Sequence, residues 1–240
     1  MNRKMNGERG MSLVEVTIIL MVLALLTAVI APSIDDYIKD ARQVKAKEDV
    51  EAIGVSLVRM LKDTGAPFPL RSGSVDIADR YKINNRVDLL FGPGNAASIV
   101  VADNPVFAPG AASATTSPIN WGRAAGAGIE SLEAHLVLNT PAYAPPLLTE
   151  AALAGSGGPR FGIGWRGAYL SALSADPWGN RYEVNSVMIG VGSDSVDLGW
   201  NTDTVVISAG SNSVMNSTFA QAGFAAGVDD IVFVIQGSTR

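Results

Sequence analysis

The sequence contains no cysteine and only one histidine, His135. Without cysteine no disulfide can form, and zinc or copper sites of the usual Cys and His type are almost excluded. His135 has no acid and nucleophile beside it in the sequence, and we expect it to be an ordinary helix residue. No phosphate-binding loop or nucleophile elbow occurs either. Together these absences predict that the protein is not an enzyme.

Charged residues are also scarce. Asp, Glu, Lys and Arg make up 17% of the 240 residues, and the formal net charge is −5. Nucleic-acid-binding domains usually carry a basic patch, so this balance gives no support for a nucleic-acid partner. We expect the protein surface to be rich in alanine, glycine, serine and threonine rather than in charge.

One long apolar run stands near the N-terminus. Between residues 11 and 31 only Glu15 is charged. A helix of this length would extend about 31 Å, which is enough to cross the hydrocarbon core of a bilayer. Arg3, Lys4 and Arg9 precede the run, and this excess of positive charge predicts a cytoplasmic N-terminus. The sequence therefore predicts a single-pass protein whose bulk lies across the membrane.

Glu15 distinguishes this run from an ordinary signal or anchor. A secretory signal peptide has a shorter apolar region of about 7–15 residues, and a plain anchor leaves the carboxylate unexplained. A basic leader ending in Gly10, an apolar helix and an acid five residues after the glycine resemble the N-terminal signal of type IV pilins and type II secretion pseudopilins. The resemblance implies cleavage by prepilin peptidase between Gly10 and Met11, N-methylation of Met11, and a role for Glu15 in assembly. Met11 departs from the family, where phenylalanine is commoner.

The apolar pattern becomes one-sided after Pro32. Apolar residues recur at intervals of three and four up to Leu61, with charged residues between them. This spacing predicts one helix from about Ser12 to Lys62, whose second half packs on a globular domain. Thr64 and Gly65 are expected to end it. We therefore divide the chain into a leader (1–10), an N-terminal helix (11–63, transmembrane to about 31) and a globular domain (64–240).

The globular part shows β-branched segments at its C-terminal end. Residues 182–189, 203–208 and 231–235 are predicted to form a three-stranded antiparallel sheet, and residues 86–91 and 97–101 could be short strands. Residues 128–138 have the spacing of a short amphipathic helix. The predicted fold class is α+β, with the long helix packed on a small C-terminal antiparallel sheet.

A second block carries a closer resemblance. Residues 176–182 read DPWGNRY, and Asp, Pro, Gly and Asn at these spacings predict a tight turn. This string, with GWRGAYL at 164–170 and GIESLEAHLV at 128–137, is similar to the major pseudopilin of type II secretion. The resemblance covers about residues 10–65 and 128–235. The interval at about 70–126 has no counterpart and is interpreted as an insertion.

In major pseudopilins the loop between the last two strands binds calcium. The matching segments here are SAGSNS at 208–213 and VDDI at 228–231. The resemblance therefore implies a calcium site at Asn212, Asp229 and Asp230, with Asn212 where the family has aspartate. An amide oxygen can ligate Ca²⁺, but with one charge fewer the site should be weaker. The alternative is that these residues make only turn hydrogen bonds.

The resemblance implies a structural function, as a subunit of a type II secretion pseudopilus that polymerises through its N-terminal helix to drive protein export. Its partners would be copies of itself, minor pseudopilins, the inner-membrane assembly platform and prepilin peptidase. It would reside in the inner membrane, with its globular domain periplasmic, or extracellular in an assembled filament. One alternative is a type IV pilus subunit of a surface fibre. Another is a membrane-tethered binding or adhesin domain that does not polymerise.

Overall fold

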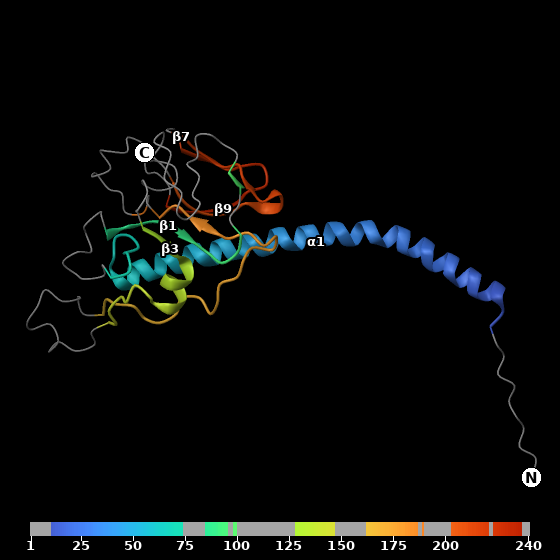
Figure 1. The fold of residues 1–240 in the computed structure, drawn as a ribbon, viewed down its shortest axis with the longest axis horizontal. Coiled ribbons are helices and arrows are strands. Elements are labelled where there is room, and N and C mark those ends of the chain that lie inside the picture. Colours follow the sequence, from blue (N-terminus) through green and yellow to red (C-terminus); the bar gives the residue numbers. More distant parts are fainter. Residues whose placement is uncertain are drawn as a thin grey trace, which may run out of the picture. The chain divides into compact units, whose positions relative to one another are not determined.

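The computed structural model describes residues 11–73, 85–95, 98–99, 128–146, 162–186, 189, 203–220 and 223–236. The chain divides into two compact units, Met1–Arg42 and Gln43–Arg240. Figure 1 shows the course of the chain, in which the described part begins with a long helix and continues into strands and short helical turns. The leader, including Gly10, and most of the predicted insertion lie outside the described residues.

The N-terminal helix, α1, spans Leu13–Thr64 and continues through Pro32. Its end is fixed locally, because the hydroxyl of Thr64 donates to the carbonyl oxygen of Met60 at 2.8 Å. Gly65 follows with φ +63°, a left-handed conformation that glycine adopts without steric cost. The prediction of a single helix from about Ser12 to Lys62 is therefore confirmed to within two residues at its C-terminal end.

The main sheet has five strands, in the order β3-β1-β4-β5-β9. Strand β1 spans Val87–Phe91, β3 Gly128–Ser131, β4 Glu183–Val184, β5 Thr204–Ser208 and β9 Ile231–Gln236. Strands β1 and β3 are parallel, and the other three pairs are antiparallel. The predicted three-stranded sheet corresponds to β4, β5 and β9. These three strands pair antiparallel as predicted, but the sheet has five strands rather than three. Strand β1, which falls inside the interval interpreted as an insertion, and β3 extend it.

The predicted helix at residues 128–138 is wrong for its first four residues. Its first part is strand β3, where Glu130 pairs with Leu90 of β1. Residues 132–138 are helical, and Ala134–Leu138 within them form a short π-helix, η2. The spacing of Ile129, Leu132 and Leu136 suits a helix. Residues 128–131 form a strand because the edge of β1 offers them backbone hydrogen bonds that a helix could not use.

The remaining elements are short. Strand β2 (Ser98–Ile99) pairs with β6 (Val214–Met215), and β7 (Thr218–Ala220) pairs with β8 (Gly223–Ala225). A single 3₁₀ turn, η6 (Gly210–Asn212), follows β5. The elements η6, β6, β7 and β8 lie in the connection between β5 and β9, which also carries the predicted calcium residues.

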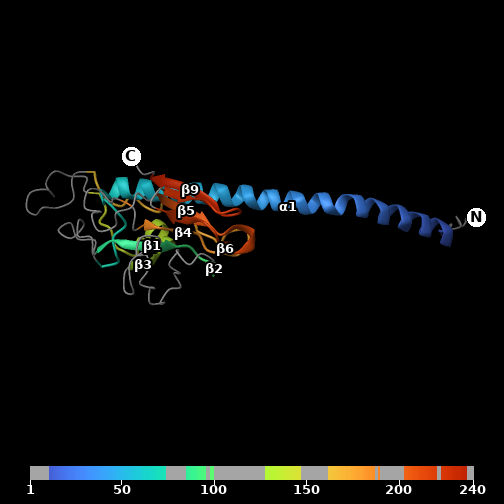
Figure 2. The same cartoon turned by 90° about the horizontal axis from the view of Figure 1, so that it is seen from above.

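The core of the second unit forms where the later part of α1 packs on the sheet (Figure 2). Side chains alternate across β5: Val206 belongs to the cluster that includes Ile53 and Leu57 of α1, whereas Val205 and Ile207 belong to a second cluster. Fully burying one such side chain stabilises the fold by about 1.5–3 kcal/mol. The buried positions of α1 begin at Ala46 and recur at Val50, Ile53, Gly54, Ser56, Leu57, Met60 and Thr64.

Gly54 allows the closest approach of α1 to the sheet. A Cβ atom at this position would lie 2.4 Å from Cδ1 of Phe233, on β9. Contacts under about 3 Å do not occur between carbon atoms, so any larger residue would push the ring away. The glycine costs roughly 1 kcal/mol of helix propensity, and this cost is offset by the packing of Phe233 against the helix.

Candidate functional site

The predicted processing and assembly residues lie at the start of α1. Met11 immediately precedes the helix, Glu15 lies in its first turn, and both are exposed. A carboxylate in the first turn also interacts favourably with the helix dipole, typically by 0.3–1 kcal/mol at an exposed site. Gly10 lies outside the described residues, so the cleavage site remains a prediction from the sequence.

The first part of α1 is apolar, and its side chains are exposed. Every residue from 11 to 45 is exposed, and Leu13, for example, is 80% exposed. By length and composition α1 could cross a membrane, although a signal sequence near the N-terminus would have the same properties. An exposed apolar surface of this extent is costly in water and indicates contact with a membrane or another protein. Its large apolar side chains include Ile18, Ile19, Leu20, Met21, Val22, Leu23, Leu25, Leu26, Val29 and Ile30.

The DPWGN block forms the tight turn that the sequence predicts. The amide of Gly179 donates to the carbonyl oxygen of Asp176 at 2.9 Å, and Gly179 has φ +90°. The Asp176 carboxylate, which is almost fully buried, accepts hydrogen bonds from the amides of Trp178 and Asn180 at 3.0 and 2.8 Å. Its other oxygen accepts from the hydroxyl of Ser208, at the end of β5, at 2.7 Å. This turn therefore connects the start of β4 to the end of β5.

The turn also supports the loop that begins with η6. The side-chain amide of Asn180 donates to the carbonyl oxygen of Gly210 at 3.3 Å. Gly210 has φ +64°, and a Cβ there would lie 2.1 Å from the carbonyl oxygen of Asp229. Only glycine allows the two segments to come so close. The structure thereby brings together the segments that carry Asn212 and Asp229.

Asn212 and Asp229 bind each other. The Nδ2 of Asn212 donates to Oδ1 of Asp229 at 2.7 Å, and the backbone amide of Asn212 donates to Oδ2 at 3.1 Å. The Oδ2 atom also accepts from the hydroxyl of Ser211 at 3.3 Å. The Oδ1 of Asn212 accepts from the amide of Val214 at 2.6 Å, which closes a turn.

Asp230 binds the other side of the same loop. Its Oδ2 accepts from the amides of Asn216 and Ser217 at 2.8 and 2.6 Å and from the hydroxyl of Ser217 at 2.6 Å. Its Oδ1 is buried and has no hydrogen-bond partner among the described residues. Burial raises the pKa of Asp230, assisted by the charge of Asp229 and opposed by the hydrogen bonds from Ser217 and Asn216.

These contacts do not present the ligand set that calcium needs. Ca²⁺ takes six to eight oxygen ligands. Asn212 turns its amide nitrogen toward Asp229 and its oxygen toward Val214, and both oxygens of Asp229 already accept hydrogen bonds. In the part of the chain that the structure describes, no group of three or more His, Cys, Asp or Glu side chains could hold a metal ion. The predicted calcium site stays a prediction.

The structure places His135 in a network that the sequence does not reveal. The ring is fully buried, with Nε2 2.9 Å from Oε2 of Glu130 and Nδ1 3.3 Å from the hydroxyl of Tyr143. The amide of Leu70 donates to that hydroxyl at 2.8 Å, and Ser72 donates twice to Glu130. The network therefore holds the segment that follows α1 against β3 and η2. The ring of His135 is shielded from solvent, and its hydrogen bonds hold neighbouring segments of the fold together.

The network also shifts ionisation equilibria: burial and the charge of Glu130 raise the pKa of Tyr143. Burial by itself raises the pKa of Glu130, but the hydrogen bond from His135, those from Ser72 and the charge of His135 together lower it below its usual value. No spacing in the sequence could have identified the network, because its members lie on separate segments that only the fold brings together.

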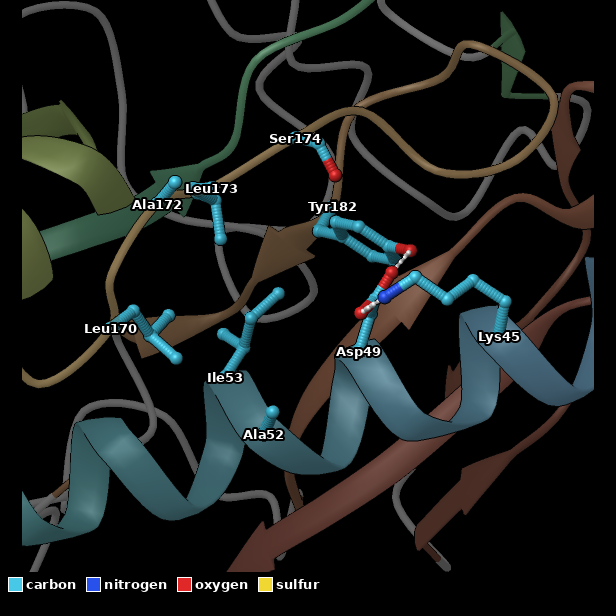
Figure 3. A pocket seen from close by; sticks show the side chains of 9 residues that line it. All are labelled: Lys45, Asp49, Ala52, Ile53, Leu170, Ala172, Leu173, Ser174 and Tyr182. Carbon is cyan, nitrogen blue, oxygen red and sulfur yellow. Dashed lines mark hydrogen bonds and ion pairs between the residues drawn. The ribbon is translucent and has the colours of Figure 1, made fainter.

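A small cavity of about 110 Å³ opens beside α1 (Figure 3). Lys45 and Asp49 form an ion pair on the helix, and the hydroxyl of Tyr182 donates to Oδ2 of Asp49 at 2.9 Å. Burial, and then the hydrogen bond to Asp49 and its charge, raise the pKa of Tyr182, so the phenol remains a neutral donor. The cavity has room for only a few water molecules, and none of the predicted site residues line it. Its other lining residues are Ala52, Ile53, Leu170, Ala172, Leu173 and Ser174.

The architecture of the chain is pilin-like, with a long apolar N-terminal helix and a C-terminal mixed sheet on which the later part of that helix packs. No family model, curated protein or solved structure matches this chain. The similarity to pseudopilins therefore depends on the motifs of the sequence and on this architecture.

Proposed function

We propose that the protein is a structural subunit of a type II secretion pseudopilus, which polymerises through α1. The observation that carries this proposal is the exposed, mainly apolar surface of residues 11–31, in which Glu15 is the only charged residue. A bilayer covers such a surface before assembly, and the α1 helices of neighbouring copies cover it in a filament.

A plain membrane anchor would not need Glu15. Burying an unpaired carboxylate costs several kcal/mol, and the new amine that cleavage creates on Met11 supplies a partner of opposite charge. In our proposal Glu15 of one copy pairs with the Met11 amine of its neighbour. This pair sets the axial register between apolar helices that otherwise offer few fixed contacts. It also couples assembly to processing, because the uncut chain has no amine at that position.

The remaining partners and the location follow from the same proposal. Prepilin peptidase removes residues 1–10 and methylates Met11 in the inner membrane. The assembly platform then adds the subunit to a filament that also contains minor pseudopilins, with the globular domains on the outside. The protein has a mechanical rather than an enzymatic role in this scheme.

The decisive experiment is to express the full chain together with a prepilin peptidase and the assembly platform, and to look for filaments by electron microscopy. We expect short filaments confined to the periplasm at native expression levels. The matched control is Gly10→Val, which should leave an uncut chain in the membrane and abolish filaments. Long surface fibres would support a type IV pilus instead. A correctly processed chain that never forms filaments would support the tethered binding domain and would refute the proposal.

A further inference from the structure

We propose that hydrogen bonds between Asn212 and Asp229 close the loop between β5 and β9 without a metal ion, and that the Asn212 amide stands in the position of a cation. We refer to these two residues and the hydrogen bonds between them as the loop clamp. The inference concerns the folded domain and is independent of the proposed pseudopilus function.

The orientation of the Asn212 side chain is fixed by two contacts. Its Oδ1 accepts the amide hydrogen of Val214 at 2.6 Å, and its Nδ2 donates to Oδ1 of Asp229 at 2.7 Å. Rotating the amide by 180° would set nitrogen against the N–H of Val214 and oxygen against the carboxylate of Asp229. Both contacts would then be repulsive, because donors would face donors and acceptors would face acceptors. The side chain therefore presents N–H groups, not an oxygen ligand, to Asp229.

Asp229 is satisfied by this arrangement. Its carboxylate accepts hydrogen bonds from the Asn212 side chain, the Asn212 backbone amide and the Ser211 hydroxyl. Hydrogen bonds to a charged acceptor are about twice as strong as those between neutral groups. Three donors thus supply the stabilisation that a bound cation would otherwise give to this carboxylate. The close approach of Gly210 to the backbone of Asp229 holds the same two segments together.

A single change should convert the clamp into a cation site. Asn212→Asp replaces the donating NH₂ group with an oxygen, which would lie at hydrogen-bond distance from Oδ1 of Asp229. Two carboxylates so close repel each other strongly unless a cation or a proton separates them. Calcium favours such oxygen-rich, acidic sites.

The test compares the melting temperature of the full chain in detergent, in excess EDTA and in millimolar calcium, followed by the fluorescence of its four tryptophans. The wild-type protein should melt at the same temperature in both solutions. Asn212→Asp should melt about 5 °C lower in EDTA and should recover most of this loss in calcium, because an ion bound only to the folded state stabilises it. The matched control, Asn212→Ser, removes the donor without adding charge and should be destabilised equally in both solutions.

Two results would overturn the inference. A wild-type melting temperature that falls in EDTA and returns with calcium would show that the native loop already needs a cation. An Asn212→Asp variant that does not respond to calcium would show that the amide does not occupy a cation position. Calcium titrations of wild type and Asn212→Asp by calorimetry give an independent reading, in which only the variant should release or absorb heat.

Discussion

Removing the carboxylate of Asp176 should destabilise the globular domain more than any other single change in the DPWGN turn. Asp176 is 4% exposed and accepts hydrogen bonds from the amides of Trp178 and Asn180 and from the hydroxyl of Ser208. Asp176→Ala leaves these three donors without an acceptor. Each unsatisfied buried donor costs about 1–3 kcal/mol, and water entering the space left by the side chain recovers part of this. We therefore expect a loss of about 3–5 kcal/mol.

The matched variant is Asp176→Asn, which keeps an acceptor for the two backbone amides. Its NH₂ group can donate to Ser208, whose hydroxyl is able to accept as well as donate. Only the long contact from the side-chain amide of Asn180, at 3.4 Å, has no replacement. This variant should lose about 1 kcal/mol. An exposed acid, Glu133, serves as a control, because Glu133→Ala should leave stability nearly unchanged.

The assay is thermal unfolding of the full chain in detergent, monitored by circular dichroism and tryptophan fluorescence. For a domain of this size 1 kcal/mol corresponds to about 2–4 °C, so Asp176→Ala should melt roughly 10 °C below the wild type and Asp176→Asn about 3 °C below. The reasoning fails if Asp176→Ala melts within about 2 °C of the wild type. It also fails if both variants lose the same stability, because negative charge rather than acceptor geometry would then hold the turn.

Three further predictions follow from the sites described above. Mass spectrometry of the native protein should show loss of residues 1–10 and a methyl group on Met11; a full-length chain, or one cut after Ala31, would contradict the pilin-like processing. Glu15→Leu should insert and be processed but assemble poorly or not at all, and Glu15→Asp should be intermediate because its reach is shorter; normal filaments from Glu15→Leu would show that the carboxylate does not set the register. The lowered pKa of Glu130 means that its ionised form contributes stability above the unfolded-state value of about 4.5, and this contribution is lost as the pH falls through the folded-state value. Wild type should therefore lose more stability than Glu130→Gln between about pH 5 and pH 3, as measured by urea unfolding, and equal losses would exclude this linkage.

The sequence predicts well those features that depend on neighbouring residues. The helix α1 follows from the apolar spacing up to Leu61, and its end follows from Thr64 and Gly65, whose conformations are set locally. The turn at Asp176 follows in the same way, because an Asp side chain bonds to amides two and four residues ahead. Strands β5 and β9 were predictable from runs of β-branched residues.

Sequence reasoning fails where a distant partner decides the structure. Residues 128–131 carry a spacing that suits a helix, but they form β3 because β1 has a free edge to pair with. The sheet has five strands because β1, which comes from the interval interpreted as an insertion, pairs with both β4 and β3. The buried contacts of His135 with Glu130 and Tyr143 depend on the same packing.

The loop after β5 shows most clearly which features depend on the sequence alone and which depend on the tertiary structure. The sequence by itself determined that Asn212, Asp229 and Asp230 would belong to one loop region, because glycine and polar residues separate two strands of the sheet. It left open whether they bind calcium or make only turn hydrogen bonds, since both arrangements use the same residue types. The tertiary structure decides how these side chains are oriented: the Val214 amide takes the oxygen of Asn212, so that its nitrogen is directed at Asp229. Orientation of an amide depends on the donors and acceptors around it, and these are brought together only by the fold.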